Sequence, residues 1–375
     1  MSKSTRKGPA LICLLCAGLA LPGCGMALAG CGDGTGREPA PRRQQAPRRR
    51  QTAHEQVKAW SAQRGVAEEP RRLFSPASIW NRALAPEAPL DPDSAAIVAA
   101  LAREVAQEQS ERRGPWINTS SFGVPIVTVP AGQPTVPVAL DHAPEPALSS
   151  AWSAVPLPAS SRPTREGEGY LVVLQPSTDR MWEFWQLGRD GDGWHATWGG
   201  AMRDVSSNPG VYGPEAWPGA QPWWGATASS LALAGGVITL DQLRSGQIDH
   251  ALALAVPDVR AGVFAAPAQR TDGSSADPLA LPEGAHLRLD PRLDLARLAL
   301  PPVTRMIAEA AQRYGIVVRD YASEVAFIAQ DPTPTGENPY LGPNGLFEGR
   351  YPSQLLASFP WEHLQLLAMD LHARR

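Results

Sequence analysis

The sequence has no cysteine and no lysine over most of its length. All four cysteines lie within the first 31 residues, and all three lysines lie within the first 58. The remaining chain therefore offers no thiol nucleophile, no cysteine-bound zinc, no disulfide framework and no lysine for phosphate binding or Schiff-base chemistry. It also contains no HExxH, GxSxG, P-loop or GxGxxG motif. These absences exclude several large enzyme classes.

The composition predicts a mainly β protein. The chain has 375 residues, of which 43% are hydrophobic, and it contains 38 prolines and 34 glycines. The hydrophobic fraction is sufficient for a real core, whereas the frequent prolines and glycines favour turns and short strands over a helical bundle. We expect an α+β fold that is mainly β, with a β-sandwich or barrel-like core and a few peripheral helices.

The N-terminus has the pattern of a bacterial export signal. Lys3, Arg6 and Lys7 precede an apolar run over residues 9–22. The sequence Leu-Ala-Gly-Cys that ends at Cys31 resembles the lipobox of bacterial lipoproteins, which implies lipidation of Cys31. Cys24 is a second candidate, and an ordinary secretory signal is the alternative. We predict a lipoprotein signal peptide over 1–31, a disordered Arg/Pro-rich tether over 32–72 and one globular domain over 73–375.

Charge is divided unevenly along the chain. Residues 37–72 contain ten basic and four acidic side chains, whereas residues 73–375 contain 21 basic and 32 acidic ones. An acidic body argues against nucleic acid as a partner. The basic tether is compatible with an anionic envelope surface or with a plain spacer role.

Hydrophobic spacing predicts the main elements. Apolar residues recur at helical spacing after Asp93 and after Pro302, and again in the last 15 residues, whereas short β-rich runs fill the space between. We expect helices over 94–109 and 302–314, a hairpin over 316–330, a loop over 331–351 and a terminal helix. Strands are expected over 124–129, 135–140, 170–175, 181–187, 194–199, 237–240, 250–256, 262–265 and 286–289.

Tryptophan is concentrated in one segment. Seven of the twelve tryptophans lie between positions 182 and 224. Because an indole offers a flat apolar face and one N–H donor, it suits the face of a sugar ring. Trp217, Trp223 and Trp224 lie in a loop rich in glycine and proline and are our candidate sugar contacts, although core packing is the alternative for each.

Three polar segments, around residues 201–208, 241–250 and 270–288, carry the other candidate residues. Their pattern Gly246-x-Ile-x-His250-Ala-Leu, then Ser274-Ser-x-Asp277-Pro, then Pro282-x-Gly-x-x-x-Arg288-Leu resembles a widespread group of secreted bacterial proteins without an established activity. The resemblance implies one exported domain and supplies no mechanism. Its matching positions here are Asp204, Asn208, His250, Asp277 and Arg288, and Arg270 stands where an Arg or His is expected.

These residues are compatible with two reactions on a polysaccharide. Hydrolysis of a glycosidic bond needs an acid that protonates the leaving oxygen and a carboxylate that activates water or attacks carbon. β-Elimination needs a cation that neutralises a uronate and a base that removes its C5 proton. The candidate catalytic residues are Asp204, His250, Asp277, Arg270 and Asp241, and the candidate substrate-binding residues are Trp217, Trp223, Trp224, Asn208, Arg288, His286 and Tyr340. Structural alternatives exist for His250 (a core histidine), Asp277 (a turn) and Asp241 (the first turn of a helix).

The sequence thus predicts an exported, lipid-anchored protein that acts on an extracellular polysaccharide. A glycoside hydrolase or polysaccharide lyase is the main hypothesis, and a non-catalytic carbohydrate-binding or envelope protein is the alternative. We expect no cofactor, no metal site and no nucleic-acid partner, with the membrane reached through the lipid anchor.

Overall fold

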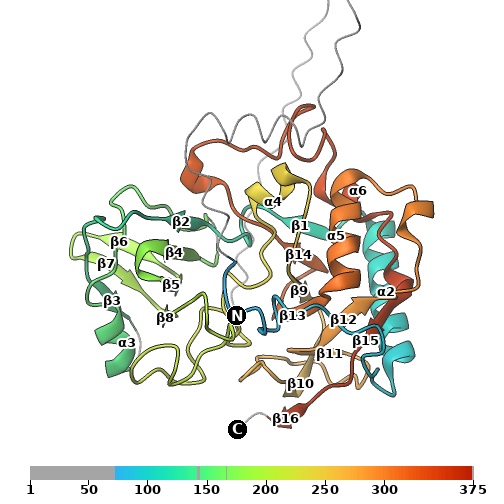
Figure 1. Cartoon of the computed structure of the whole chain (residues 1–375), viewed down its shortest axis with the longest axis horizontal. Coiled ribbons are helices and arrows are strands. Elements are labelled where there is room, and N and C mark those ends of the chain that lie inside the picture. The colour runs from blue at the N-terminus through green and yellow to red at the C-terminus, as the bar shows by residue number, and fades with distance from the viewer. Residues whose placement is uncertain (1–71, 142–143, 166, 374–375) are drawn as a thin grey trace, which may run out of the picture. The chain divides into compact units, whose positions relative to one another are not determined.

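A computed structural model describes residues 72–141, 144–165 and 167–373. These residues form five α-helices and 16 strands in four sheets, which confirms an α+β fold that is mainly β (Figure 1). None of the four described sheets closes into a barrel. The predicted signal peptide, Cys31 and nearly all of the tether lie outside the described residues, and those assignments and the single domain stay predictions.

The largest sheet has six strands in the order β1-β14-β9-β13-β12-β15. Its central strands β9 (Leu252–Val256) and β13 (Ile316–Tyr321) run parallel to each other. β1 (Trp116–Asn118) pairs in parallel with β14 (Ala326–Ile328), and β12 (His286–Leu289) lies between β13 and β15 (Leu364–Leu366). Every side chain of β9 is buried, as expected for a strand covered on both faces.

Three helices pack on this sheet. α2 (Ser94–Glu111) contacts β15, α5 (Pro302–Arg313) contacts β12 and β9, and α6 (Pro352–Leu356) contacts β1. α2 and α5 confirm the two helices predicted from apolar spacing and from the proline at the start of α5. Their buried faces join the strands in one hydrophobic cluster.

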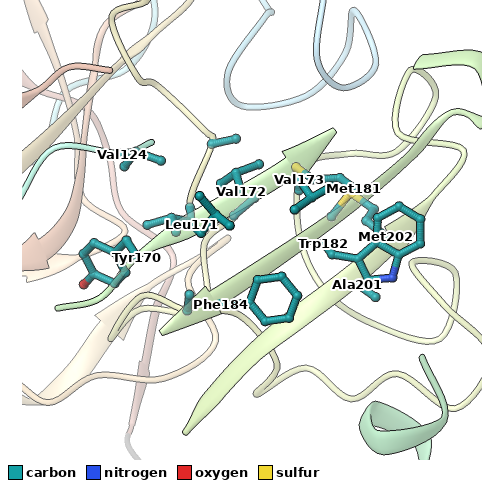
Figure 2. Packing of buried hydrophobic residues seen from close by; sticks show 14 of the residues in the cluster. Val124, Tyr170, Leu171, Val172, Val173, Met181, Trp182, Phe184, Ala201 and Met202 are labelled. Atoms are coloured by element: carbon teal, nitrogen blue, oxygen red, sulfur yellow. The ribbon is translucent and has the colours of Figure 1, made fainter. Parts of the chain in front are cut away.

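A second cluster forms around a four-stranded sheet of order β2-β4-β5-β8. Its strands are β2 (Ile126–Thr128), β4 (Leu171–Gln175), β5 (Arg180–Trp185) and β8 (Trp198–Arg203). Figure 2 shows Leu171, Trp182, Phe184 and Met202 packed along these strands. Trp182 is buried whereas Trp185 is half-buried, as expected for residues three apart on a strand.

Two small sheets and two short helices complete the described fold. β3 (Val138–Leu140), β7 (Gly193–Ala196) and β6 (Gly188–Asp190) form one sheet, and β11 (Leu281–Glu283), β10 (Val259–Ala265) and β16 (Leu371–Ala373) form the other. α3 (Pro146–Ala151) packs on β3 and β8. α4 (Leu240–Ser245) begins at a Thr239–Gln242 capping box and ends at Gly246, whose φ of 79° suits glycine.

Four predicted elements are wrong. The single strand expected over 194–199 is divided at Thr197 between β7 and β8, which belong to different sheets. β13 and β14 do not form a hairpin, because β9 lies between them and pairs with both. The expected terminal helix is absent from the described residues: Trp361–His363 forms one 3-10 turn, after which β15 joins β12 and β16 joins β10. Residues 237–240 contribute only a bridge from Ile238 to Ala329 before α4 begins. In each case pairing between distant segments overrides the local pattern.

Candidate active site

The site is built around a buried segment, residues 225–235, that is neither helix nor strand. A buried irregular backbone must find partners for its amides and carbonyls, since water cannot reach them. Glu183 on β5 supplies two acceptors: its Oε1 lies 2.8 Å from the amide nitrogen of Ala226, and its Oε2 lies 2.8 Å from that of Leu233. Glu183 is fully buried, and burial raises its pKa.

Two arginines supply the donors to the same segment. Arg270 donates from Nε to the carbonyl of Ala228 at 3.1 Å, and from Nη2 to those of Thr227 at 2.6 Å and Gly225 at 3.0 Å. Arg319 on β13 donates from Nη1 to the carbonyls of Leu233 and Gly235. Charged side chains from three separate parts of the chain therefore hold the segment in place.

The strand that carries Arg319 is irregular at this point. The pairing of β13 with β9 shifts register between Val318 and Asp320. Such a bulge changes the direction in which side chains leave a strand and is frequent beside active sites. The hydroxyl of Ser229 donates to the carbonyl of Arg319 at 2.5 Å, so the irregular residue also contacts the buried segment. Asp320, the next residue, is half-buried.

Three carboxyl groups act electrostatically on Arg270. Asp272 lies in the loop after Arg270, Glu283 is the last residue of β11, and Asp320 follows the irregularity in β13. β11 is next to β13 because the amide of Gly284 donates to the carbonyl of Val318 at 2.8 Å. Asp272, Glu283 and Asp320, which we call the carboxyl cluster, influence one another electrostatically.

Two members of the cluster, Glu283 and Asp320, have raised pKa values. Burial, reinforced by the charges of Asp320 and Asp272, raises the pKa of Glu283 to about 9. Burial also raises the pKa of Asp320 to about 7, against the opposing charge of Arg319. The exposed Asp272 contributes negative charge that raises both values. One half-buried acid that titrates near neutrality thus stands close to an exposed carboxylate.

Glu283 is unusual because neither of its oxygens has a hydrogen-bond partner, although the side chain is fully buried. Thr271 and the amide of Asp272 are close enough to lower its pKa, but neither meets the geometry of a hydrogen bond. A buried polar group without a partner is expensive in a folded protein and usually points to a functional role.

One exposed aromatic ring follows the cluster along the chain, and another precedes the buried segment. Tyr321 follows Asp320 directly and is 55% exposed. Trp223 is 47% exposed and lies two residues before Gly225, whose carbonyl binds Arg270. Large exposed rings of this kind beside polar groups are typical of surfaces that contact sugars.

Among the predicted catalytic residues, the described structure brings only Arg270 to the carboxyl cluster. Asp204 is exposed in a turn, Asp241 is exposed in the first turn of α4 beside Arg244, and Asp277 accepts a hydrogen bond from the amide of Leu279 in its own turn. His250 is half-buried, with Nδ1 at 2.8 Å from the carbonyl of Ala251, and burial lowers its pKa. For His250, Asp277 and Asp241, the local role foreseen as the alternative describes these contacts.

The predicted substrate-binding residues are similarly dispersed. Asn208 accepts from the amide of Gly210, Arg288 donates to Gln365 and to the carbonyl of Ala85, and Tyr340 donates to the carbonyl of Gln330. His286 contacts the carbonyl of Tyr314, and burial lowers its pKa to about 4. Trp217 packs on Trp182, Trp224 is fully buried, and only Trp223 presents a large exposed face.

The sequence analysis missed Glu183, Asp272, Asp320 and Arg319. Three of them carry a visible signal: Glu183 interrupts the apolar run Met-Trp-Glu-Phe-Trp, and Arg319 and Asp320 end the apolar run Ile-Val-Val. A charged residue inside a strand that is otherwise apolar must be paired or functional, because burying it alone is costly. Asp272 stands only two residues after Arg270 but gives no such signal.

The two described cavities lie elsewhere. One, of about 480 Å³, is lined by Arg244, Pro339 and residues 341–346, and the other, of about 650 Å³, runs along α2 beside β15. Within the described ranges no three His, Cys, Asp or Glu side chains are placed to hold a metal ion. None of the helices described is long and apolar enough to cross a membrane. Comparison with protein-family models, curated proteins and solved structures finds no significant match.

Proposed function

We propose that the protein hydrolyses glycosidic bonds in an extracellular polysaccharide, with the carboxyl cluster as its acid–base centre. The observation that carries the proposal is that the buried, unpartnered Glu283 lies on β11 next to β13, which carries the half-buried Asp320, and that the exposed Asp272 acts electrostatically on both. Glycosidases use two carboxyl groups held in different environments, one protonated and one ionised.

In this proposal Asp320 is the general acid. Its proton passes to the glycosidic oxygen as the bond from that oxygen to the anomeric carbon breaks. The Asp272 carboxylate either takes a proton from the attacking water or bonds to the anomeric carbon before water releases the sugar. In both routes one water is consumed and both carboxyl groups return to their starting states.

Arg270 and Arg319 act as positioning residues. Their hydrogen bonds to Thr227 and Leu233 fix the segment that leads back to the exposed Trp223. Trp223 and Tyr321 provide the apolar faces on which sugar rings stack. Arg319 is buried, and the described hydrogen bonds of Arg270 go to backbone carbonyls, so neither guanidinium group is held in place for a uronate carboxylate, which favours hydrolysis over β-elimination.

Export and a lipid anchor at Cys31 complete the proposal. They are supported by the sequence alone, through the basic start, the apolar run and the lipobox-like Leu-Ala-Gly-Cys. Lipidation would tether the acidic body at the surface where polysaccharide is met. Incorporation of radioactive palmitate into the wild-type protein, lost in Cys31→Ser and kept in Cys24→Ser, tests this assignment.

The reaction is tested with the full-length protein in mild detergent on a panel of polysaccharides. We expect new reducing ends from at least one polymer and none from Asp320→Asn or Asp272→Asn. Asp192→Asn is the matched control, since Asp192 is an exposed aspartate in the tip of the β6–β7 hairpin. Binding without new reducing ends, or products with the ultraviolet absorbance of an unsaturated uronate, would refute hydrolysis.

A further inference from the structure

Two half-buried tryptophans lie side by side at one end of the four-stranded sheet. Trp185 ends β5 and Trp198 begins β8, and the antiparallel register of these strands makes the two residues direct partners. Partners of this kind project from the same face of a sheet. Glu183 is two residues before Trp185 and shares that face, which is the one that holds residues 225–235. The tryptophan pair therefore lies on the same face of the sheet as the candidate active site.

Hydrogen bonds of the indole nitrogens set the direction in which each ring extends. Trp185 Nε1 donates to Oε2 of Glu168 at 2.7 Å, and Glu168 lies just before β4, which flanks β5 on one side. Trp198 Nε1 donates to the backbone carbonyl of Trp223 at 3.3 Å, and β8, which carries Trp198, is the edge strand on the other side of β5. The rings therefore follow one another across the end of the sheet.

Trp223 adds a third ring to the pair. Its side chain is 47% exposed, and the amide of Gly225, two residues later, donates to the carbonyl of Gly199 on β8 at 2.9 Å. This stretch of chain thus lies against the edge strand. Trp185, Trp198 and Trp223, which we call the indole row, come from β5, β8 and the loop that follows β8. Because the protein itself holds the indole N–H groups of the first two, their rings are oriented before a ligand binds, which lowers the entropy cost of binding.

The polar groups beside the indole row suit hydroxyl groups. Gln186 follows Trp185 directly and is exposed, and the hydroxyl of Thr197 donates to its Oε1 at 2.7 Å. The side-chain nitrogen of Gln186 can therefore donate to a ligand. Glu168 accepts one indole bond and has further lone pairs for hydroxyl donors. An amide donor and a carboxyl acceptor match the hydroxyls of a sugar and disfavour an anionic polymer.

We propose that the indole row binds an uncharged polysaccharide, an extended chain of β-linked hexoses, over several consecutive sugar units. The inference rests on the proposed function for its polysaccharide substrate and deepens that function by naming the class of polymer. An extended chain with equatorial hydroxyls presents apolar C–H faces along its length, and these stack on the indoles. Its hydroxyl groups reach Gln186 and Glu168. An α-linked coil turns successive faces in different directions and cannot follow a row of rings.

The test of the ligand class compares three hexamers of equal length. Cellohexaose, maltohexaose and galacturonate hexamer are titrated into the full-length protein in mild detergent, and binding is measured by calorimetry. We expect cellohexaose to bind about tenfold more tightly than either of the others. Failure of cellohexaose to bind overturns the inference, as does equal or tighter binding of maltohexaose or galacturonate hexamer.

Substitutions assign the binding to the indole row. Trp185→Ala and Trp198→Ala should each weaken cellohexaose binding about tenfold. Trp116→Ala is the matched control and should keep the affinity, since Trp116 is also half-buried but begins β1 in the six-stranded sheet. Circular dichroism checks that each variant is folded. If an alanine variant does not fold, Gln186→Glu decides the matter, because it changes an exposed side chain beside the row and should also weaken binding.

The outcomes separate this inference from the proposed hydrolysis. Hydrolysis of a polysaccharide, with the same cellohexaose affinity in the row variants as in the wild-type protein, overturns the indole row and leaves the hydrolase proposal standing. A loss of the same size in Trp116→Ala also overturns the assignment. Cellohexaose binding that depends on the row, without new reducing ends from any polymer, supports the indole row and refutes the hydrolase.

Discussion

The Nη2 atom of Arg270 lies 2.6 Å from the carbonyl oxygen of Thr227, and this contact defines what the arginine does. The sequence suggested that Arg270 meets substrate, whereas its described hydrogen bonds go to the backbone of residues 225–228. Arg270 therefore holds this stretch of backbone in place.

Replacing Arg270 should destabilise the fold. Arg270→Lys keeps the charge but cannot reach three carbonyls at once, because an ammonium is a single point on a flexible stem. We expect a loss of about 2 kcal/mol in the free energy of unfolding, measured by urea titration. Arg189→Lys is the control, since Arg189 is exposed. Unchanged stability in Arg270→Lys would contradict the positioning role.

Glu183 should tolerate substitution even less well than Arg270. Glu183→Gln offers one acceptor in place of two, so either Ala226 or Leu233 loses the partner of its buried amide. An unsatisfied buried donor costs about 1–3 kcal/mol. Glu183→Leu leaves both amides unpaired and should destabilise the protein more. Equal midpoints of thermal unfolding for the two variants would show that the hydrogen bonds contribute little.

Glu283 should make the protein less stable at high pH. Its pKa is raised from 4.5 to about 9 by burial, so the folded state holds a proton that the unfolded state releases once the pH exceeds 4.5. The stabilisation from this group is therefore complete below that pH and is lost as the pH rises towards 9. Urea titrations at several pH values should show the decline, and Glu283→Gln should flatten it.

The rate of hydrolysis should fall as the pH rises through about 7. Burial raises the pKa of Asp320 to about 7, and a general acid is inactive once its proton is lost. The Asp192→Asn control should show the same fall in hydrolysis rate at high pH, which we call the alkaline limb. If the limb persists in Asp320→Asn, another group is the acid, and His250→Gln then tests the residue that the sequence analysis favoured.

Two adjacent tryptophans should give opposite results. Trp223 is 47% exposed, so Trp223→Ala should weaken oligosaccharide binding with little change in stability. Trp224 is fully buried, and its replacement by alanine should lower the free energy of unfolding by about 3–5 kcal/mol. Fluorescence titration and thermal unfolding of both variants give the comparison. Loss of binding only in Trp224→Ala would place the sugar contact elsewhere.

The sequence predicts the elements whose signals are local. α2 and α5 follow from apolar spacing and an early proline, and the end of α4 follows from Gly246. Pairing between strands that are distant in the sequence gives no such local signal. Nothing in residues 316–330 indicates that β9, some 60 residues earlier in the chain, separates β13 from β14. For the same reason Leu364 and Leu371 read as one helical face although they belong to strands of two sheets.

The site was predictable only in part. Arg270 was named because of a resemblance, and its loop does lead to the carboxyl cluster. Asp320 and Glu183 were passed over because a charge in an apolar strand does not reveal which distant group compensates it. The residues of strongest resemblance, such as His250 and Asn208, instead make local hydrogen bonds that shape turns and strand starts.

Leu233 links the two main sheets through its backbone. Its amide donates to Glu183 on β5, and its carbonyl accepts from Arg319 on β13. One peptide segment thus bridges the four-stranded and the six-stranded sheets, so strain on either sheet reaches the other without passing through a hinge. A proteolytic cut within residues 225–235 should weaken this connection, and thermal unfolding of the cut protein would measure the loss of stability.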